Sequence, residues 1–309
     1  MEIQFIEHQD IDMDKWNSCI DHSVNQLPYA NSWYLDTVCP GWNALVGDDY
    51  KAVFPLTGRS RFNYHYLFQP SFATQLGLFS GQLLTEDIIH RFIQEIPSFY
   101  KKIDINLNRY NNPDHSRFSI IQNYNFELPL IKKYEDLERD YSDTLKKELK
   151  IAKESKLAVM PQVNPGEIIR LFQLNKRKHS AKAIQSSEYH TLEQLIYKLA
   201  KRGLVDLKGV FTERHHLCAA GVFLKMNDRI IYLFSGYNEE GRQVAAIPRL
   251  IDSVVQANAR KNLILDFVMA HNAKSLELYK RFGAREVSFP GIKINRLPWY
   301  QQIISGILR

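Results

Sequence analysis

A carboxylate inside an apolar run is the first residue of this chain whose position calls for a chemical explanation. Asp266 interrupts the run LILDFVMA at 263–270. A buried carboxylate needs a hydrogen-bonding or ionic partner, and burial raises its pKa toward values suited to proton transfer. The same surroundings suit a structural salt bridge. We therefore treat Asp266 as a candidate catalytic acid or base, with the salt bridge as the alternative.

Two other charged groups could act on a substrate. Glu239 and Glu240 precede a predicted helix, where they could deprotonate an amine or complement the helix dipole. The basic run NKRKHSAKA at 175–183 could bind an anionic substrate, or it could be a solvated helix face. Its substrate candidates are Arg177, Lys178 and His179.

The composition of the chain excludes several classes of protein. No run approaches the roughly 20 apolar residues of a membrane span, and the acidic N-terminus does not resemble a secretion signal. The three cysteines lie far apart and outside any metal-binding spacing, so neither disulfides nor a metal is expected. The net charge of +6 favours anionic partners. We expect a cytoplasmic protein with no membrane span and no DNA partner.

The second half of the chain shows a clear order of elements. Strand patterns with turn residues between them come first, then helical spacing, a short buried strand, a second helix and a last strand. Gly283 lies where a left-handed helix cap is expected. The strands are predicted at 204–213, 217–226, 229–238, 263–270 and 286–294, and the helices at 245–262 and 272–284.

The first half repeats much of this order. Thr85 is the predicted N-cap of its main helix. A polar stretch, RYNNPDHSRF at 109–118, replaces the second helix. Strands are predicted at 42–47, 51–60, 63–70 and 103–110, and near FELPLI at 126–131. Such a repeat predicts an α/β (α+β) protein in which helices cover the faces of two mixed sheets.

A charged segment separates the two halves. YEDLERDYSDTLKKELKIAKESKL at 134–157 has sparse apolar positions, which predicts a solvated connecting helix. We therefore expect an N-terminal unit at 1–135, a connecting helix at 136–159 and a C-terminal unit at 160–309.

The segment HNAKSLELYKRFGA at 271–284, with the order of elements around it, resembles the GNAT acyl-CoA N-acyltransferases. The matching positions are Asn272, Ala273, Leu278, Tyr279, Lys280, Phe282, Gly283 and Ala284. Two such units in one chain are similar to the Fem-type peptidoglycan aminoacyltransferases and their double-acetyltransferase-fold relatives. The resemblance implies two tandem GNAT-like units, each a mixed, mostly antiparallel sheet flanked by helices, with the chemistry in the second.

The resemblance also implies roles for individual residues. Tyr279 would protonate the leaving thiolate, although a packing aromatic is the alternative, and Asn272 would contact the cofactor or cap its helix. A splayed strand edge at Ser235, Gly236 and Tyr237 would bind the donor. The segment Gly241, Arg242, Gln243, Val244, Ala245 and Ala246 would hold phosphates, but it departs from the family because it lacks the usual glycines. In the first half, Trp33 and Tyr34 would line the substrate groove or pack in the core.

The expected activity is direct transfer of an acyl group to a primary amine. The donor would be acetyl-CoA or another acyl-CoA, and the acceptor a small molecule or a precursor bearing an amine. One alternative is aminoacyl transfer from charged tRNA to a cell-wall or lipid precursor. The other is a non-catalytic binding protein that retains the fold.

Overall fold

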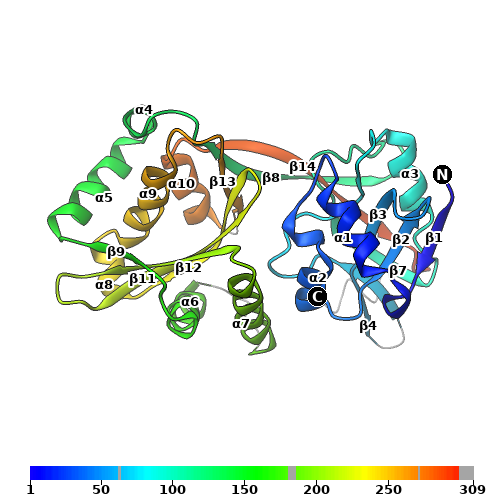
Figure 1. Cartoon of the computed structure of the whole chain (residues 1–309), viewed down its shortest axis with the longest axis horizontal. Coiled ribbons are helices and arrows are strands. Elements are labelled where there is room, and N and C mark those ends of the chain that lie inside the picture. The colour runs from blue at the N-terminus through cyan, green and yellow to red at the C-terminus, as the bar shows by residue number, and fades with distance from the viewer. Residues whose placement is uncertain (62–63, 180–185, 271, 299–309) are drawn as a thin grey trace. The chain divides into compact units, whose positions relative to one another are not determined.

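The computed structural model describes residues 1–61, 64–179, 186–270 and 272–298, and the chain divides into two compact units (Figure 1). Unit 1 is formed by Met1–Asn123 with the segment from Ser288 on, and unit 2 by Tyr124–Val287. In both units helices flank mixed, mostly antiparallel sheets, which confirms the predicted fold class.

The division differs from the expected boundaries at 135 and 160. The chain enters unit 2 within strand β8 (Ser119–Pro129), and it leaves again within strand β14 (Arg285–Asn295). Both strands are long enough to contribute to each unit, so no separate linker is needed. The C-terminal strand therefore completes unit 1 by pairing with β7 (Tyr100–Asn106).

Unit 2 is built on one sheet in the order β8, β13, β12, β11, β10, β9. The pair β12–β13 is parallel and its neighbours are antiparallel. The remaining strands are β9 (Ala158–Pro161), β10 (Val205–Phe211), β11 (Leu217–Met226), β12 (Arg229–Tyr237) and β13 (Ile264–Met269). The helices are α4 (Tyr134–Arg139), α5 (Asp143–Glu154), α6 (Pro165–His179), α7 (Ser186–Lys201), α8 (Glu239–Gln243), α9 (Ala246–Asn258) and α10 (Ala273–Arg281).

Helices cover both faces of this sheet. Helices α5, α9 and α10 lie on one face and α6 and α7 on the other (Figure 1). The apolar residues of α9 recur at helical spacing, and Leu250, Ile251 and Val255 are fully buried against the strands. The predicted left-handed cap of α10 is confirmed, because Gly283 has φ +77°.

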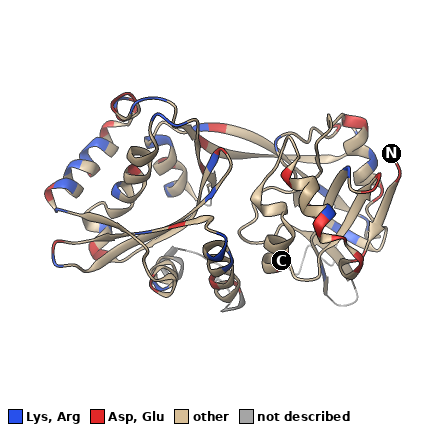
Figure 2. Cartoon of the chain, in the orientation of Figure 1, with Lys and Arg blue, Asp and Glu red and all other residues tan. Residues whose placement is uncertain are grey.

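The segment expected to be a solvated connecting helix is instead part of the core of unit 2. Lysines recur along α5 (Figure 2), but Leu145 and Ala152 on its other side are fully buried. Buried Asp252 of α9 accepts hydrogen bonds from the hydroxyls of Tyr134 (3.0 Å) and Tyr141 (3.2 Å). The segment is therefore anchored in two ways. The narrow apolar stripe of α5 packs into the core, and the two tyrosines that precede α5 add polar contacts that the spacing of apolar residues does not reveal.

Unit 1 has two sheets, in the orders β1-β2-β3-β6 and β4-β5-β7-β14. Their other strands are β1 (Ile3–Ile6), β2 (Asn43–Gly47), β3 (Ala52–Leu56), β4 (Gly58–Arg61), β5 (Tyr64–Phe68) and β6 (Phe79–Ser80). The helices are α1 (Met13–Asp21), α2 (Ser32–Val38) and α3 (Glu86–Gln94), with 3-10 turns at His8–Asp10 and Pro28–Ala30. Thr85 caps α3 as predicted, since its side chain accepts from the amide of Ile88.

Residues 107–118 of unit 1 form no helix between β7 and β8, in agreement with the polar stretch predicted there. Three buried asparagines hold this segment by hydrogen bonds to the backbone of Leu78, namely Asn25, Asn108 and Asn111. Within the described ranges, no helix has both the length and the apolarity that a bilayer crossing requires.

The placement of α5 in a core gives the first testable prediction. We expect Leu145→Ala to lower the free energy of unfolding by about 3 kcal/mol, because it leaves a cavity in a fully buried site. Ile151→Ala, on the exposed side of the same helix, should cost less than about 1 kcal/mol. Chemical denaturation measures both losses of stability. Equally small losses for the two variants would mean that α5 is a solvated connecting helix.

Candidate functional site

Strands β12 and β13 separate after a short stretch of pairing. Their parallel register joins Arg229, Ile230 and Ile231 to Ile264, Leu265 and Asp266. From Tyr232 to Tyr237, β11 is the only strand in the described part of the chain that pairs with β12. One edge of β12 is thus left open over these residues, as expected for the splayed strand.

A β-bulge marks the beginning of this open edge. Val222 pairs with Phe234 and Phe223 with Tyr232, so Leu233 is an extra residue in β12. A bulge bends its strand and increases the local twist, which turns the strand away from its neighbour. Strand β12 is therefore paired with β13 at its start and separated from β13 at its end.

The direction of the backbone groups decides which residues face the open edge. The amide of Asn238 donates to the carbonyl of Cys218 in the β11 direction. Because backbone groups alternate in direction along a strand, those of Gly236 and Phe234 also point toward β11. Those of Ser235 and Tyr237 point the other way, toward the open side.

A buried ionic cluster fastens the paired end of the strands. Nη1 of Arg229 lies 2.7 Å from Oε1 of Glu127 and 3.1 Å from Oδ2 of Asp266, so one guanidinium joins β8, β12 and β13. The other oxygen of Asp266 accepts from Asn125 (2.6 Å) and from the amide of Val268 (2.8 Å). Burial raises the pKa of Asp266 to about 6, although Arg229 opposes this.

These contacts bear on the proposed catalytic role of Asp266. Its side chain is 3% exposed, and both oxygens are engaged. This geometry favours the salt-bridge alternative. The cluster includes two residues that the sequence did not single out, Arg229 and Glu127, because their pairing depends on the register of distant strands.

Strand β13 also contains a strained residue beside the cluster. Its register with β8 shifts between Asp266 and Met269, and Val268 there has φ +55°. A β-branched residue rarely adopts this left-handed conformation, which costs about 1–3 kcal/mol. The hydrogen bond from the Val268 amide to Asp266 helps to hold it. Both strands therefore bend away from regular pairing close to the point where they part.

Tyrosine side chains connect α10 with the open edge. The hydroxyls of Tyr232 and Ser235 share a hydrogen bond. The ring of Tyr232 lies 6.4 Å from that of Tyr279, which in turn stacks on Phe267 at 4.8 Å. Burial raises the pKa of Tyr279 well above its ordinary value, although the Ser275 side chain one turn earlier in α10 opposes this shift. Tyr279 thus packs as an aromatic residue, with its ring beside that of Tyr232, the hydrogen-bond partner of Ser235.

The segment expected to hold phosphates begins as a short helix. Residues 239–243 form the short helix α8, capped by Asn238, whose side chain accepts from the Gly241 amide at 2.8 Å. The amides of Arg242 and Val244 donate to Asn238 and Glu240. These three amides are therefore already engaged. The remaining amides lie at the start of α9, where first-turn groups have no acceptor within the helix.

The residues of this segment also have structural roles or surroundings of their own. Exposed Glu239 forms an ion pair with Arg242, which favours the structural alternative for that acid. Gln243 is exposed, and Val244 is half-buried against the core. Ala245 adopts a left-handed conformation at φ +54°, and Ala246 is buried behind it. Position 245 is thus one where glycine would be free of strain.

The other predicted residues fall in three different settings. Asn272 caps α10 by accepting from the Ser275 amide at 2.9 Å. Tyr34 is fully buried in unit 1 and donates to the carbonyl of Phe72 (2.6 Å), so it is a core residue, while neighbouring Trp33 is half-buried. The side chains of Arg177, Lys178 and His179 lie outside the part of the chain that the structure describes.

Gly236 has a packing role that the sequence did not reveal. A Cβ atom there would overlap the backbone of Leu171 and Phe172, so only glycine allows α6 to cross β12 this closely. One turn farther along α6, the side chain of Asn175 contacts the backbone of Tyr237. No motif pointed to Asn175; an asparagine inside a helix is only a weak signal.

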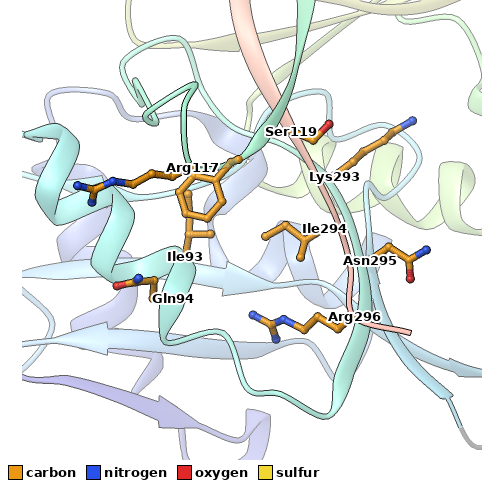
Figure 3. A pocket seen from close by; sticks show the side chains of 9 residues that line it. Ile93, Gln94, Arg117, Ser119, Lys293, Ile294, Asn295 and Arg296 are labelled. Atoms are coloured by element: carbon orange, nitrogen blue, oxygen red, sulfur yellow. The ribbon is translucent and has the colours of Figure 1, made fainter. Parts of the chain in front are cut away.

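Hollows on unit 1 contain none of the predicted site residues. One has a volume of about 550 Å³ and includes Arg117, Lys293 and Arg296 (Figure 3). Each of these cations already has a partner: Arg117 pairs with Asp114, Lys293 with Asp104, and Arg296 donates to the carbonyls of Ile96 and Pro97. Another, of about 620 Å³, lies beside α1. In the described residues, no three potential metal ligands cluster.

The pKa of Asp266 gives a prediction for the stability of the fold. Between pH 4 and pH 6 the folded chain holds this proton more tightly than the unfolded chain, so the contribution of Asp266 to stability falls as pH rises. From pH 4 to pH 7 we expect the stability of wild type relative to Asp266→Asn to fall by up to about 3 kcal/mol. Denaturant unfolding at the two pH values measures this difference.

The exposed substitution Asp21→Asn serves as the control, since it should show no comparable change between the same pH values. The stability difference between wild type and Asp266→Asn could instead stay constant or grow as pH rises. That result would contradict the claim that burial raises the pKa of the Asp266 carboxylate.

Comparison with known proteins supports the fold. A scan against models of protein families finds no match, and a search of curated proteins finds none either. Among solved structures, FemX aligns with a TM-score of 0.69 at 12% identity, covering 98% of this chain and 100% of its own. A tandem GNAT protein from the clavulanic acid biosynthesis pathway aligns with a TM-score of 0.53 at 10% identity, covering 96% and 99%. L-PGS from Bacillus licheniformis aligns with a TM-score of 0.56 at 8% identity, covering 96% and 95%. The chain therefore has the tandem GNAT-like fold that it shares with FemX.

Proposed function

We propose that unit 2 transfers an acyl group from an activated donor to a primary amine at the open edge of β12. The observation that carries this proposal is the separation of β12 from β13 after Ile231. It leaves the backbone groups of Ser235 free to pair with the amide groups of a donor. A strand edge that binds its ligand by backbone hydrogen bonds fixes the ligand's direction as well as its position.

The proposed reaction is a direct transfer with no covalent enzyme intermediate. The nitrogen of the amine attacks the acyl carbon, a carbon–nitrogen bond forms, and the bond from the acyl carbon to the leaving sulfur breaks. Tyr279 gives its proton to the sulfur and is restored by the proton that the nitrogen loses. The phenol of Tyr279 is protonated at neutral pH and so has a proton to give, although burial raises its pKa and makes it a weaker acid than a tyrosine in water.

We propose acyl-CoA, with acetyl-CoA as the simplest case, as the donor. The first-turn amides of α9 would hold its phosphates, together with the left-handed Ala245 that turns the chain into this helix. In this scheme Asp266 and Asn272 position β13 and α10 rather than touch the reacting atoms, as their engaged side chains support.

Aminoacyl-tRNA is the second candidate donor, and one observation favours it. The amides of Gly241, Arg242 and Val244 are engaged within and around α8, which reduces the groups available to a pyrophosphate. An aminoacyl ester would present the same acyl carbon at Ser235. Its leaving oxygen, belonging to a ribose, would take the proton in place of sulfur.

The proposal is tested by transfer assays with Tyr279→Phe. We expect turnover to fall about 100-fold, a common effect of losing a general acid, while the free energy of unfolding changes by less than about 1.5 kcal/mol. The substitution removes one hydroxyl and keeps the ring stacked on Phe267. Labelled acetyl-CoA and labelled aminoacyl-tRNA are supplied in separate assays with a panel of amines.

Tyr197→Phe is the matched control, because Tyr197 is exposed on α7. Transfer by Tyr279→Phe as fast as by wild type would show that Tyr279 is not the acid. Binding of a donor without transfer by wild type would instead support a non-catalytic binding protein.

A further inference from the structure

The side chain of Asn175 occupies part of the open edge of β12. Its Oδ1 accepts from the Tyr237 amide at 2.7 Å, and its Nδ2 donates to the Tyr237 carbonyl at 2.9 Å. Because one atom meets a donor and the other an acceptor, the orientation of this amide is fixed by its partners. Asn175 thus pairs with Tyr237 as a neighbouring strand would.

The contact is built into the packing of α6. Leu171 and Phe172 press against Gly236, where the lack of a side chain lets the helix come close. The ring of Phe172 also lies 5.0 Å from that of Phe234. Asn175 follows Leu171 by one helical turn, so it lies on the same face and reaches the next residue of β12. The position of Asn175 is therefore set by apolar contacts on either side of Gly236.

The pairing has a consequence for any ligand that adds to this edge. Ser235 and Tyr237 are the residues whose backbone groups point to the open side beyond the bulge. They are two residues apart, which is the repeat of a strand, so an extended amide ligand could pair with either one in the same manner. Pairing at Tyr237 would shift the acyl carbon along the strand by about 7 Å, away from Tyr232 and Tyr279.

We infer that Asn175 is a positioning residue that sets the register of the donor. By occupying Tyr237, it leaves Ser235 as the residue with which the donor's amide groups pair. This places the acyl carbon beside Ser235 and its hydrogen-bond partner Tyr232. The inference rests on the proposed transfer function. It adds Asn175 of α6 to the donor site, a residue that the transfer chemistry alone does not require.

The test compares Asn175→Ala with Gln173→Ala, a substitution on the same helix, in the full chain. Without the side-chain amide, donor can also bind unproductively at Tyr237. With acetyl-CoA as donor, or aminoacyl-tRNA if that proves to be the substrate, we expect kcat and the KM for donor to fall together by about two- to tenfold. Their ratio should change little, and Gln173→Ala should behave as wild type.

A second readout does not depend on activity. Amide hydrogen exchange of Tyr237 in the free protein should be faster in Asn175→Ala than in wild type or Gln173→Ala. Asn175→Asp keeps an acceptor for the Tyr237 amide, so it should retain more protection and show a smaller kinetic effect. It also serves if the alanine variant folds poorly.

Other results would overturn the inference. A fall in KM with unchanged kcat would mean that donor displaces Asn175, and a rise in KM would mean that Asn175 binds donor directly. Kinetics like those of Gln173→Ala, or a Tyr237 amide no less protected in Asn175→Ala, would also refute it. Failure of the wild-type protein to transfer from either donor is a different result. It would refute the proposed function, and the inference about donor register would fall with it.

Discussion

The arrangement of unit 2 depends on how β12 is held at one end and released at the other. Arg229 joins two carboxylates from neighbouring strands, so the start of β12 cannot leave the sheet without exposing an unpaired buried charge. A few residues later the extra residue Leu233 turns the strand away from β13. The open edge is therefore a stable feature of the folded chain rather than a frayed end, and the groups around it can be positioned accurately.

Unit 1 shows what the same order of elements gives without this device. Its parallel pair, β5 and β7, stays joined from His65 to the last residue of β5, Phe68. A loop held by buried asparagines stands where unit 2 has α10. The described residues of unit 1 show no open edge along β5 and no counterpart of Tyr279, so they lack the features on which the proposal for unit 2 rests. Two copies of one fold have thus taken different forms through local pairing.

The sequence predicted the elements better than the contacts between them. Helix α10, its cap Asn272 and its end at Gly283 follow from local rules, as does the capping of α3 by Thr85. The burial of α5 and the pairing of Asp266 with Arg229 and Glu127 could not be read locally, since each depends on residues brought from distant segments. The role of Asn175 could not be predicted for the same reason. Its role comes from the crossing of α6 over Gly236, which no spacing in the sequence encodes.

The central claim is that the open edge of β12 receives the donor. Residue-resolved amide exchange of the wild-type chain, with and without acetyl-CoA or an unreactive aminoacyl-RNA analogue, tests it most directly. We expect added protection at the Ser235 amide, with Tyr237 already protected in the free protein and with β5 of unit 1 unchanged. Protection that appears on β5, or no change at Ser235 with either ligand at saturation, would contradict the account.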